Sequence, residues 1–208
     1  MRRIPEKEKP VSLEEAEKYI KRYLKDKRCY KHPLKQVKSL GIKGGYLEID
    51  FGPAIMAMEV AKSMDNIRVT GIERCRHRID AAEKIINEEG LEGKIRLLSA
   101  DAEKNLSPEE LGEFDLIYCV YTLHHWQNPK TAISNLLKHL KKNGLIFIYD
   151  LKRVPCLYYL PLKNNFLNSV RASYTIREIK NILGSYKNLK IDINEDFLGM
   201  GIIIKVCG

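Results

Sequence analysis

The chain has 208 residues, of which 44% are hydrophobic and 30% are charged, and its formal net charge is +9. This length supports one sizeable core and is short for two domains. The sequence contains no run of the roughly 18–20 apolar residues that a membrane span needs. The N-terminus lacks the apolar stretch of a secretory signal, and the five cysteines form no CxxC pair, so we expect reduced thiols and a cytoplasmic protein.

The positive charge is compatible with an anionic partner such as nucleic acid. The lysines follow predicted helices and are mixed with glutamates, and no dense basic block stands out. Abundant Lys, Glu and Ile also resembles thermophile composition, in which surface ion pairs are common. A nucleic-acid partner is therefore possible but not favoured on charge alone.

The N-terminal part predicts a loose polar arm over residues 1–11 and then two helices. Ser12-Leu13-Glu14-Glu15 is a capping box, because the serine can accept from the amide three residues on and Glu15 can reach back. It predicts a helix over 13–27 with one apolar face. A second short helix is expected over 33–40, ending at Gly41.

From residue 46 onwards, short apolar runs alternate with helical segments. This alternation is typical of βαβ units, a parallel sheet and helices on both faces. Strands are expected over 46–50, 67–72, 94–98, 114–120 and 145–149, and helices over 55–63, 76–89, 130–142 and, as a short turn, from Ser107.

The C-terminal part has a different order. Thr175-Ile176-Arg177-Glu178 is a second capping box, which predicts a helix ending at Gly184. Two strands follow, over 189–193 and 200–206, and the connection between them is too short for a parallel crossover. We therefore expect five parallel-type units followed by an antiparallel hairpin.

Ligands of open α/β sheets bind beyond the carboxyl ends of the strands. The first strand is followed by the loop Asp50-Phe51-Gly52-Pro53-Ala54, and the second strand ends at Glu73, about twenty residues later. That spacing is typical of an acidic residue that binds ribose hydroxyls. The next three strands are followed by 99–102, by 121–126 and by Asp150.

These segments resemble the class I S-adenosylmethionine (SAM) methyltransferases, especially the branch with small-molecule substrates that includes quinone-biosynthesis enzymes. The resemblance runs from about residue 38 to the C-terminus. It rests on five segments in order, which are 47–54, Gly71-Ile72-Glu73, Ala100-Asp101-Ala102, Leu123-His124-His125-Trp126 with residues to Gly144, and 148–151.

The resemblance implies an α/β fold, with a Rossmann-like doubly wound seven-stranded sheet made of five parallel-type units plus a C-terminal antiparallel hairpin, and helices on both faces. It implies a single methyltransferase domain over 1–208. Within it we distinguish an N-terminal helical cap (1–43), a SAM-binding core (44–151), a lid segment (152–173) and a C-terminal helix and β-hairpin (174–208).

The resemblance also implies a set of cofactor-binding residues. Glu48 would bind the methionine ammonium of SAM, and the amides around Gly52 would lie against the methionine portion. Glu73 would accept both ribose hydroxyls, and Asp101 would take the adenine amino group beside the Ala102 amide. The complete set is Glu48, Asp50, Gly52, Glu73, Arg74, Asp101, Ala102 and Val120.

The loop departs from the family pattern at two of its three glycines. Asp50 replaces the first glycine and Ala54 the third. A second carboxylate about 5 Å from the SAM carboxylate would cost about 3 kcal/mol at an effective dielectric near 20. Asp50 could instead point at the ammonium beside Glu48, or away from the ligand.

Methyl transfer from a sulfonium needs alignment of the acceptor and exclusion of water, and positioning alone supplies about 7–11 kcal/mol. A base is needed where the acceptor must lose a proton. His124 is the first candidate, because histidine titrates near neutral pH, followed by His125 and Asp150. No metal is expected. The lid segment, which is rich in aromatic side chains, is expected to cover the acceptor pocket.

Three alternatives remain open from the sequence. An RNA-directed methyltransferase fits the +9 charge, whereas amino-directed base methylation is disfavoured because Leu-His-His-Trp replaces the usual (D/N/S)-P-P-(Y/F/W) loop. An NAD-binding dehydrogenase would use Glu73, but the G-x-G-x-x-G spacing is absent. A SAM-binding protein without catalysis is motivated by Asp50 and Ala54. The methyl acceptor and the choice between monomer and homodimer are not fixed by the sequence.

Overall fold

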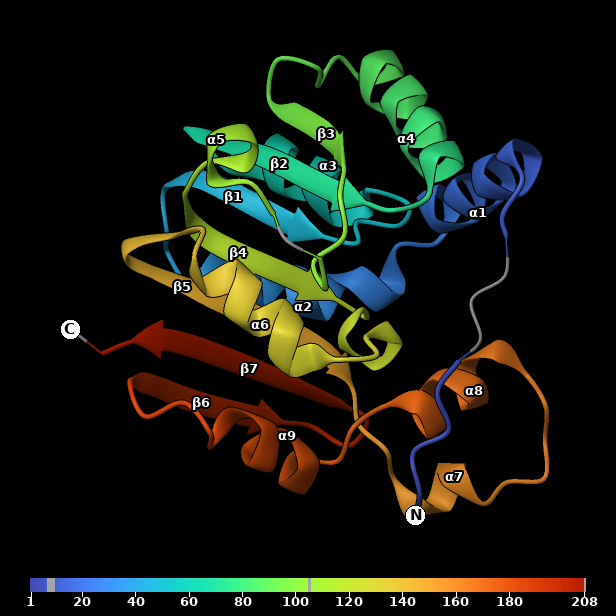
Figure 1. Ribbon diagram of the computed structural model, residues 1–208. Coiled ribbons are helices and arrows are strands. Elements are labelled where there is room, and N and C mark those ends of the chain that lie inside the picture. The colour runs from blue at the N-terminus through green and yellow to red at the C-terminus, as the bar shows by residue number, and fades with distance from the viewer. Residues whose placement is uncertain (7–9, 105, 208) are drawn as a thin grey trace.

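A seven-stranded mixed sheet forms the centre of the molecule (Figure 1). The structure is a computed structural model that describes residues 1–6, 10–104 and 106–207. The strand order is β3-β2-β1-β4-β5-β7-β6, in which the first five strands are parallel and β7 is antiparallel to both neighbours. The strands are β1 (Gly44–Ile49), β2 (Ile67–Glu73), β3 (Ile95–Ser99), β4 (Phe114–Val120), β5 (Leu140–Leu151), β6 (Leu189–Glu195) and β7 (Gly199–Val206). The predicted doubly wound sheet with its terminal hairpin is confirmed.

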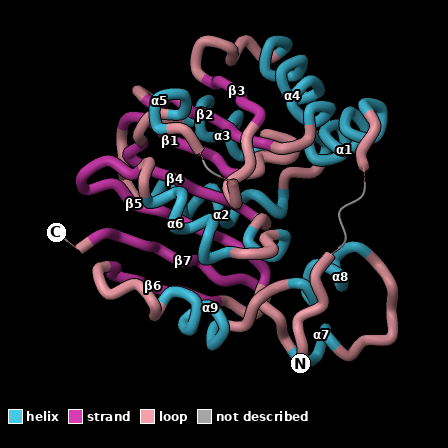
Figure 2. The backbone as a smooth tube through the Cα atoms, viewed as in Figure 1, coloured by secondary structure: helices cyan, strands magenta, loops and turns pink. Residues whose placement is uncertain are grey.

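Helices cover both faces of this sheet. The helices α1 (Leu13–Lys25), α2 (Arg28–Ser39), α3 (Ile55–Ser63) and α4 (Arg76–Glu88) contribute to one core cluster. The helices α5 (Pro108–Leu111), α6 (Pro129–Leu137) and α9 (Ile176–Leu183) lie on the other side. The short helices α7 (Pro155–Tyr158) and α8 (Asn165–Ala172) pack together beside the N-terminal segment, as Figure 2 shows.

Alternation along the strands divides the core between the two faces. In β1, Tyr46 belongs to the cluster under α1–α4, and its neighbour Leu47 belongs to the cluster under α6 and α9. Both side chains are fully buried. Burying side chains on both faces is expected for a parallel sheet covered by helices, and it leaves the strand ends as the place for chemistry.

Two helix starts follow the predicted capping boxes. The Ser12 hydroxyl accepts from the Glu15 amide, and the Glu15 carboxylate accepts from the Ser12 amide at 2.8 Å. Thr175 and Glu178 form the same reciprocal pair at α9. Each cap satisfies two amides that a helix N-terminus leaves unpaired.

The helix expected over 130–142 ends earlier than predicted. It stops at Leu137, and β5 begins at Leu140, which pairs with Phe114 of β4. The Phe114 amide donates to the His139 carbonyl at 2.8 Å, and the register shifts between Phe114 and Leu116. This inter-strand pairing at the start of β5 outweighs the helix propensity of the two following lysines.

The second helix also starts earlier than predicted, at Arg28, with Pro33 inside it. A proline in a helix leaves the carbonyl four residues earlier without its usual donor. Here the Cys29 carbonyl accepts from the Tyr121 hydroxyl at 2.9 Å. This contact with the loop after β4 replaces the missing hydrogen bond, and sequence periodicity could not reveal it.

The expectation of a loose arm is wrong for the first residues of the chain. The Ile4 amide donates to the Arg171 carbonyl at 3.1 Å, and the Tyr158 hydroxyl donates to the Arg2 carbonyl at 2.9 Å. Residues 7–9 lie outside the described part of the chain. Among the described residues, no helix is both long and apolar enough to cross a membrane.

Candidate functional site

The loop between β1 and α3 has the backbone conformation of a glycine-rich turn. Asp50, Gly52 and Ala54 have φ angles of 49°, 52° and 53°, all in the left-handed region. Glycine adopts this region freely, whereas a residue with a Cβ is strained there. The chain therefore keeps the turn at the two positions where it departs from the family pattern, and tolerates the strain.

Glu48, at the end of β1, lies beneath this loop. Its side chain is buried, and its Oε2 accepts from the Tyr118 hydroxyl of β4 at 2.9 Å. Burial raises the pKa of Glu48 to about 8, against the lowering effect of hydrogen bonds from Tyr118 and the Ala57 amide. The carboxyl group thus links β1 to β4 and to the start of α3.

Asp50 lies in the same loop and is mostly buried, with a side chain 15% exposed. Its Oδ2 accepts from Trp126 Nε1 at 3.1 Å, and its Oδ1 is 4.0 Å from Arg74 Nε. Burial, followed by the charge of Glu73, raises the pKa of Asp50 to about 7. Asp50 therefore changes its charge near neutral pH.

Glu73 ends β2 and is buried. Its Oε1 accepts from the backbone amides of Arg74 and Cys75 at 2.9 and 3.0 Å, and Arg78 Nη1 lies 3.4 Å from its Oε2. The Arg78 guanidinium also lies 5.9 Å from the centre of the Tyr19 ring of α1. The carboxylate is thus fixed by its own turn and faces α1 and α4.

The loop after β3 carries Asp101 and Ala102. Asp101 Oδ1 accepts from the Glu103 amide at 2.9 Å, and Ala102 is buried. Asn135 of α6 donates to the carbonyls of Ala102 and Lys104 at 3.0 and 2.6 Å. The position of this loop therefore depends on a buried amide more than thirty residues away, which sequence reasoning missed.

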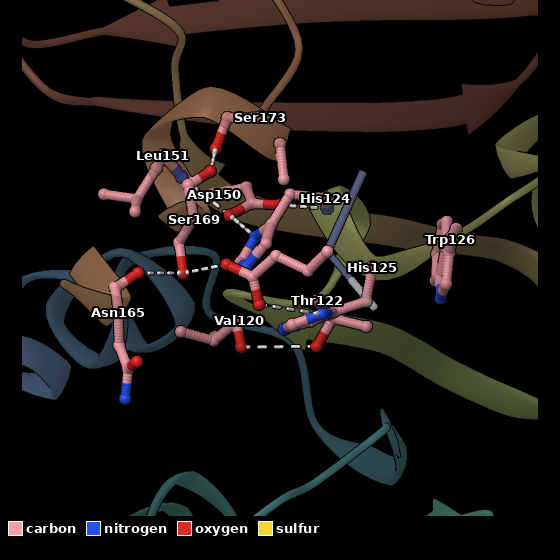
Figure 3. Close-up of polar contacts among 12 residues, drawn as sticks. Val120, Thr122, His124, His125, Trp126, Asp150, Leu151, Asn165, Ser169 and Ser173 are labelled. Atoms are coloured by element: carbon pink, nitrogen blue, oxygen red, sulfur yellow. Dashed lines mark hydrogen bonds and ion pairs between the residues drawn. The ribbon is translucent and has the colours of Figure 1, made fainter. Parts of the chain in front are cut away.

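His124 and Asp150 form a pair beyond β4 and β5 (Figure 3). Both are buried, with exposed fractions of 2% and 1%. His124 Nδ1 is 2.7 Å from Asp150 Oδ1, and the His124 amide donates to Oδ2 at 2.7 Å. Burial opposes protonation of His124, but the charge and hydrogen bond of Asp150 outweigh it, so the pKa of His124 lies above its usual value.

Glu6 of the N-terminal segment reaches the same place. Its Oε2 is 3.8 Å from His125 Nδ1, and its Oε1 accepts from the Ser169 hydroxyl of α8 at 2.7 Å. The rings of His124 and His125 have centroids 4.1 Å apart. Glu6 and Ser169 were not among the predicted site residues, because no local pattern links them to residue 125.

The remaining predicted residue, Val120, ends β4 and is half-buried. Its carbonyl accepts from the Thr122 hydroxyl at 3.3 Å. Across the loop, the Tyr19 hydroxyl lies close to Gly52, because a Cβ atom added to this glycine would be 3.7 Å from it.

The predicted residues thus form two groups at one edge of the sheet. Asp50, Glu73, Arg74 and Asp101 interact around β1–β3, while Glu48 lies below them. His124, His125 and Asp150 gather beyond β4 and β5. The first group offers carboxylates at the ends of adjacent strands, and the second offers imidazoles beside carboxylates.

Comparison with known proteins identifies one domain family. Residues 47–148 match the model of the methyltransferase domain family. The ubiquinone biosynthesis O-methyltransferase of Rickettsia conorii is 30% identical over 114 residues, which are 55% of this chain and 37% of that protein. The chain covers less than two thirds of the length of such curated relatives, for example 51% of the enzyme of the same name from Methylococcus capsulatus.

Solved structures agree with the fold over a larger share of the chain. A putative SAM-dependent methyltransferase from Methanococcus maripaludis has a TM-score of 0.73 and 18% identity, and the match covers 99% of this chain and 98% of that one. A SAM-dependent methyltransferase from Aquifex aeolicus has a TM-score of 0.68 and 18% identity, with 84% and 89% covered.

Proposed function

We propose that this chain, whose residues 47–148 match the methyltransferase domain family, is a class I SAM-dependent methyltransferase that transfers a methyl group from SAM to a small-molecule acceptor. The observation that carries this proposal is the pairing of a left-handed loop after β1 with a buried glutamate at the end of β2. The loop and the glutamate lie at the carboxyl edge of the sheet, where ligands of such folds bind.

The residues around the loop fit SAM except at Asp50, whose negative charge would repel the SAM carboxylate. The Glu73 carboxylate would accept the ribose hydroxyls, and the loop of Asp101 and Ala102, held by Asn135, would contact the adenine. Amides around Gly52 would contact the methionine portion. Asp50 is a poor neighbour for a carboxylate when ionised, but its pKa of about 7 allows it to be neutral in part.

Two predicted contacts take a modified form in this proposal. Glu48 is buried under the loop and hydrogen-bonded to Tyr118, so we propose that it supports the loop rather than contacting the ammonium directly. The positive charge of Arg74 would offset the negative charge of Asp50, and Arg74 would lie beside the adenosine. Val120 would line the site from β4.

SAM supplies a methyl group on a sulfonium, and the protein aligns the acceptor with it. We propose that the acceptor binds beside His124, His125 and Asp150. In neutral His124 the proton on Nδ1 would be directed at the Asp150 carboxylate, which leaves the lone pair on Nε2, directed away from Asp150. The lid segment with Tyr158 and α8 would cover this side together with the N-terminal residues.

The test measures S-adenosylhomocysteine formed from SAM with a panel of phenols, catechols and aliphatic alcohols. We expect product with at least one hydroxylated aromatic acceptor, and loss of turnover in a Glu73→Ala variant. Binding of SAM without transfer to any acceptor in the panel would favour a SAM-binding protein without catalysis. A tighter complex with NAD than with SAM would favour the dehydrogenase.

A second candidate is an RNA acceptor, favoured by the distribution of charge. Residues 21–43 contain nine Lys or Arg and one Asp, so they account for most of the net charge of +9. This corrects the interpretation that no dense basic block stands out. Four of these side chains recur on one face of α2 at exposed positions, namely Arg28, Lys31, Lys35 and Lys38.

The start of α2 lies beside the acceptor side of the site, since the Cys29 carbonyl contacts Tyr121. An RNA strand on α2 would lose affinity steeply with added salt. A Lys31→Glu/Lys35→Glu variant that loses RNA binding but keeps turnover of a small acceptor would argue against RNA as the substrate.

We further propose a single domain with the four parts defined above, a cytoplasmic location, and a monomer or homodimer. The five cysteines, all free thiols, support the cytoplasmic proposal. Gel filtration with light scattering would decide between the two oligomeric states.

A further inference from the structure

Three side chains at the acceptor end of the site have potential metal-binding atoms that lie close together. Glu6, His124 and His125 each contribute one nitrogen or oxygen atom, and these atoms all lie within 4.8 Å of one another. They come from two distant parts of the chain, the N-terminal segment and the single helical turn after β4, η1 (Leu123–His125). No metal was expected from the sequence, and this grouping of distant side chains differs from that expectation.

A second carboxylate orients the most buried of these ligands. Asp150 Oδ1 is 2.7 Å from His124 Nδ1, and both residues are almost completely buried. Histidines that bind metals usually donate their other ring N–H to a carboxylate or a carbonyl. With its Nδ1 proton held by Asp150, the neutral form of His124 presents the Nε2 lone pair, and a bound metal ion would take the place of the Nε2 proton.

Of the other two ligands, Glu6 is held by a hydrogen bond from Ser169, and both Glu6 and His125 are exposed enough to rotate. The Ser169 hydroxyl donates to Glu6 Oε1 at 2.7 Å, while Glu6 Oε2 lies 3.8 Å from His125 Nδ1. Ligand atoms in a tetrahedral zinc site are about 3.3 Å apart, given bonds of about 2.0–2.1 Å. The side chains of Glu6 and His125 are 24% and 34% exposed, so small rotations can bring them together.

We propose that Glu6, His124 and His125 bind a divalent transition-metal ion, with Zn²⁺ as the simplest occupant. Two imidazoles and one carboxylate match zinc and other first-row metals, whereas Mg²⁺ and Ca²⁺ prefer oxygen ligands. Three protein ligands leave a coordination position for water or for the acceptor. The site would therefore combine metal binding with the acceptor end of the proposed methyltransferase.

This role rests on the proposed function and narrows the acceptor to a hydroxyl compound. A bound metal ion lowers the pKa of a coordinated hydroxyl group, as it does for water. The hydroxyl proton passes to solvent, its oxygen bonds to the methyl carbon, and the sulfur–methyl bond breaks with both electrons left on sulfur. The products are a methyl ether, S-adenosylhomocysteine and a proton.

The test is direct metal binding by the full chain. Metal-stripped protein is titrated with Zn²⁺ by calorimetry, and Co²⁺ is added separately to record its visible spectrum. We expect one Zn²⁺ per chain and the intense Co²⁺ bands of a four-coordinate site. The His125→Ala and Glu6→Gln variants should each bind Zn²⁺ at least tenfold more weakly.

Two further variants separate a built site from adventitious binding. Asp150→Asn should lower Zn²⁺ affinity by about 10- to 100-fold, because it removes the acceptor that fixes His124. His77→Ala is the matched control, since His77 is exposed and its Nδ1 contacts the backbone carbonyl of Val11, and it should bind as tightly as the wild type. Circular dichroism checks that each variant is folded.

Equal Zn²⁺ affinity of the wild type and a folded Glu6→Gln/His125→Ala variant would overturn the metal site. S-adenosylhomocysteine is titrated into the same samples. If the protein binds S-adenosylhomocysteine but does not bind Zn²⁺, the metal site alone is rejected. If it binds Zn²⁺ but does not bind S-adenosylhomocysteine, the proposed function alone is rejected.

Discussion

At the scale of single residues, two positions in the loop after β1 hold side chains where the fold needs left-handed backbone. Asp50 and Ala54 adopt φ angles near +50°, at a cost of roughly 1 kcal/mol each. Ala54 is fully buried, so its methyl group recovers part of that cost by packing. Asp50 instead brings a carboxyl group with a pKa of about 7 into the proposed cofactor site.

We predict that cofactor affinity depends on pH through Asp50. Protonation removes repulsion between Asp50 and the carboxylate of S-adenosylhomocysteine, so affinity should increase as the pH falls from 8 to 6. At about 5 Å and a dielectric near 20, the ionised form costs about 3 kcal/mol. Calorimetric titrations at several pH values measure the effect.

Two variants check this interpretation. Asp50→Asn should bind S-adenosylhomocysteine with little pH dependence, and Asp50→Gly should bind at least tenfold more tightly than the wild type at pH 8. A wild-type affinity that rises with pH would mean that the ionised carboxylate attracts the ligand, for example through its ammonium.

A further prediction concerns Glu48, whose pKa of about 8 lies above its ordinary value of 4.5. The folded state therefore binds this proton more tightly than the unfolded state. The resulting stability is complete below pH 4.5 and is lost as the pH rises to about 8. Glu48→Gln should thus be more stable than the wild type above pH 8, by at least ~1 kcal/mol.

Urea denaturation at pH 5 and pH 8.5 measures this difference. Glu14→Gln is the control, because Glu14 lies exposed on α1. Equal pH dependence of the wild type and Glu48→Gln would show that Glu48 is ionised in the folded protein.

At the scale of elements, local signals predicted most helices and strands. The capping boxes at Ser12 and Thr175 placed two helix starts correctly, because such caps act within four residues. The misplaced boundaries at α2 and at the end of α6 depend on distant partners. The Cys29 carbonyl accepts a hydrogen bond from the Tyr121 hydroxyl, and the His139 carbonyl accepts one from the Phe114 amide. No local pattern encodes these partners.

The N-terminal segment shows the same limit, and its anchoring is testable. Arg3 donates to the carbonyls of Ala172, His124 and Trp126, and its guanidinium lies 4.3 Å from the centre of the Tyr174 ring. We expect Arg3→Ala to lower the free energy of unfolding by about 1–3 kcal/mol, since hydrogen bonds from charged groups contribute that much.

The measurement is urea denaturation with Arg2→Ala as the control, because the Arg2 contact with Tyr158 uses its backbone carbonyl. Affinity for S-adenosylhomocysteine should change less than twofold, because Arg3 lies at the acceptor end of the site. Unchanged stability in Arg3→Ala would mean that the segment is loosely held.

At the scale of the whole molecule, the doubly wound sheet with its antiparallel hairpin could be predicted from the sequence, whereas the assembly of the site could be predicted only in part. Glu73 ends β2 and Asp101 follows β3, so the sheet alone brings them to one edge. Glu6, Ser169 and His125 are separated by more than forty residues from one another, and only the packing of the N-terminal segment on α8 brings them together.

The central claim is that this edge binds SAM, and titration of the full chain with S-adenosylhomocysteine tests it most directly. We predict one site per chain, with affinity at least tenfold weaker in Glu73→Ala. At a ligand concentration of about 100 times Kd, the wild type should gain about 2.7 kcal/mol in free energy of unfolding. No binding up to millimolar ligand, by the wild type and by Asp50→Gly alike, would contradict the claim.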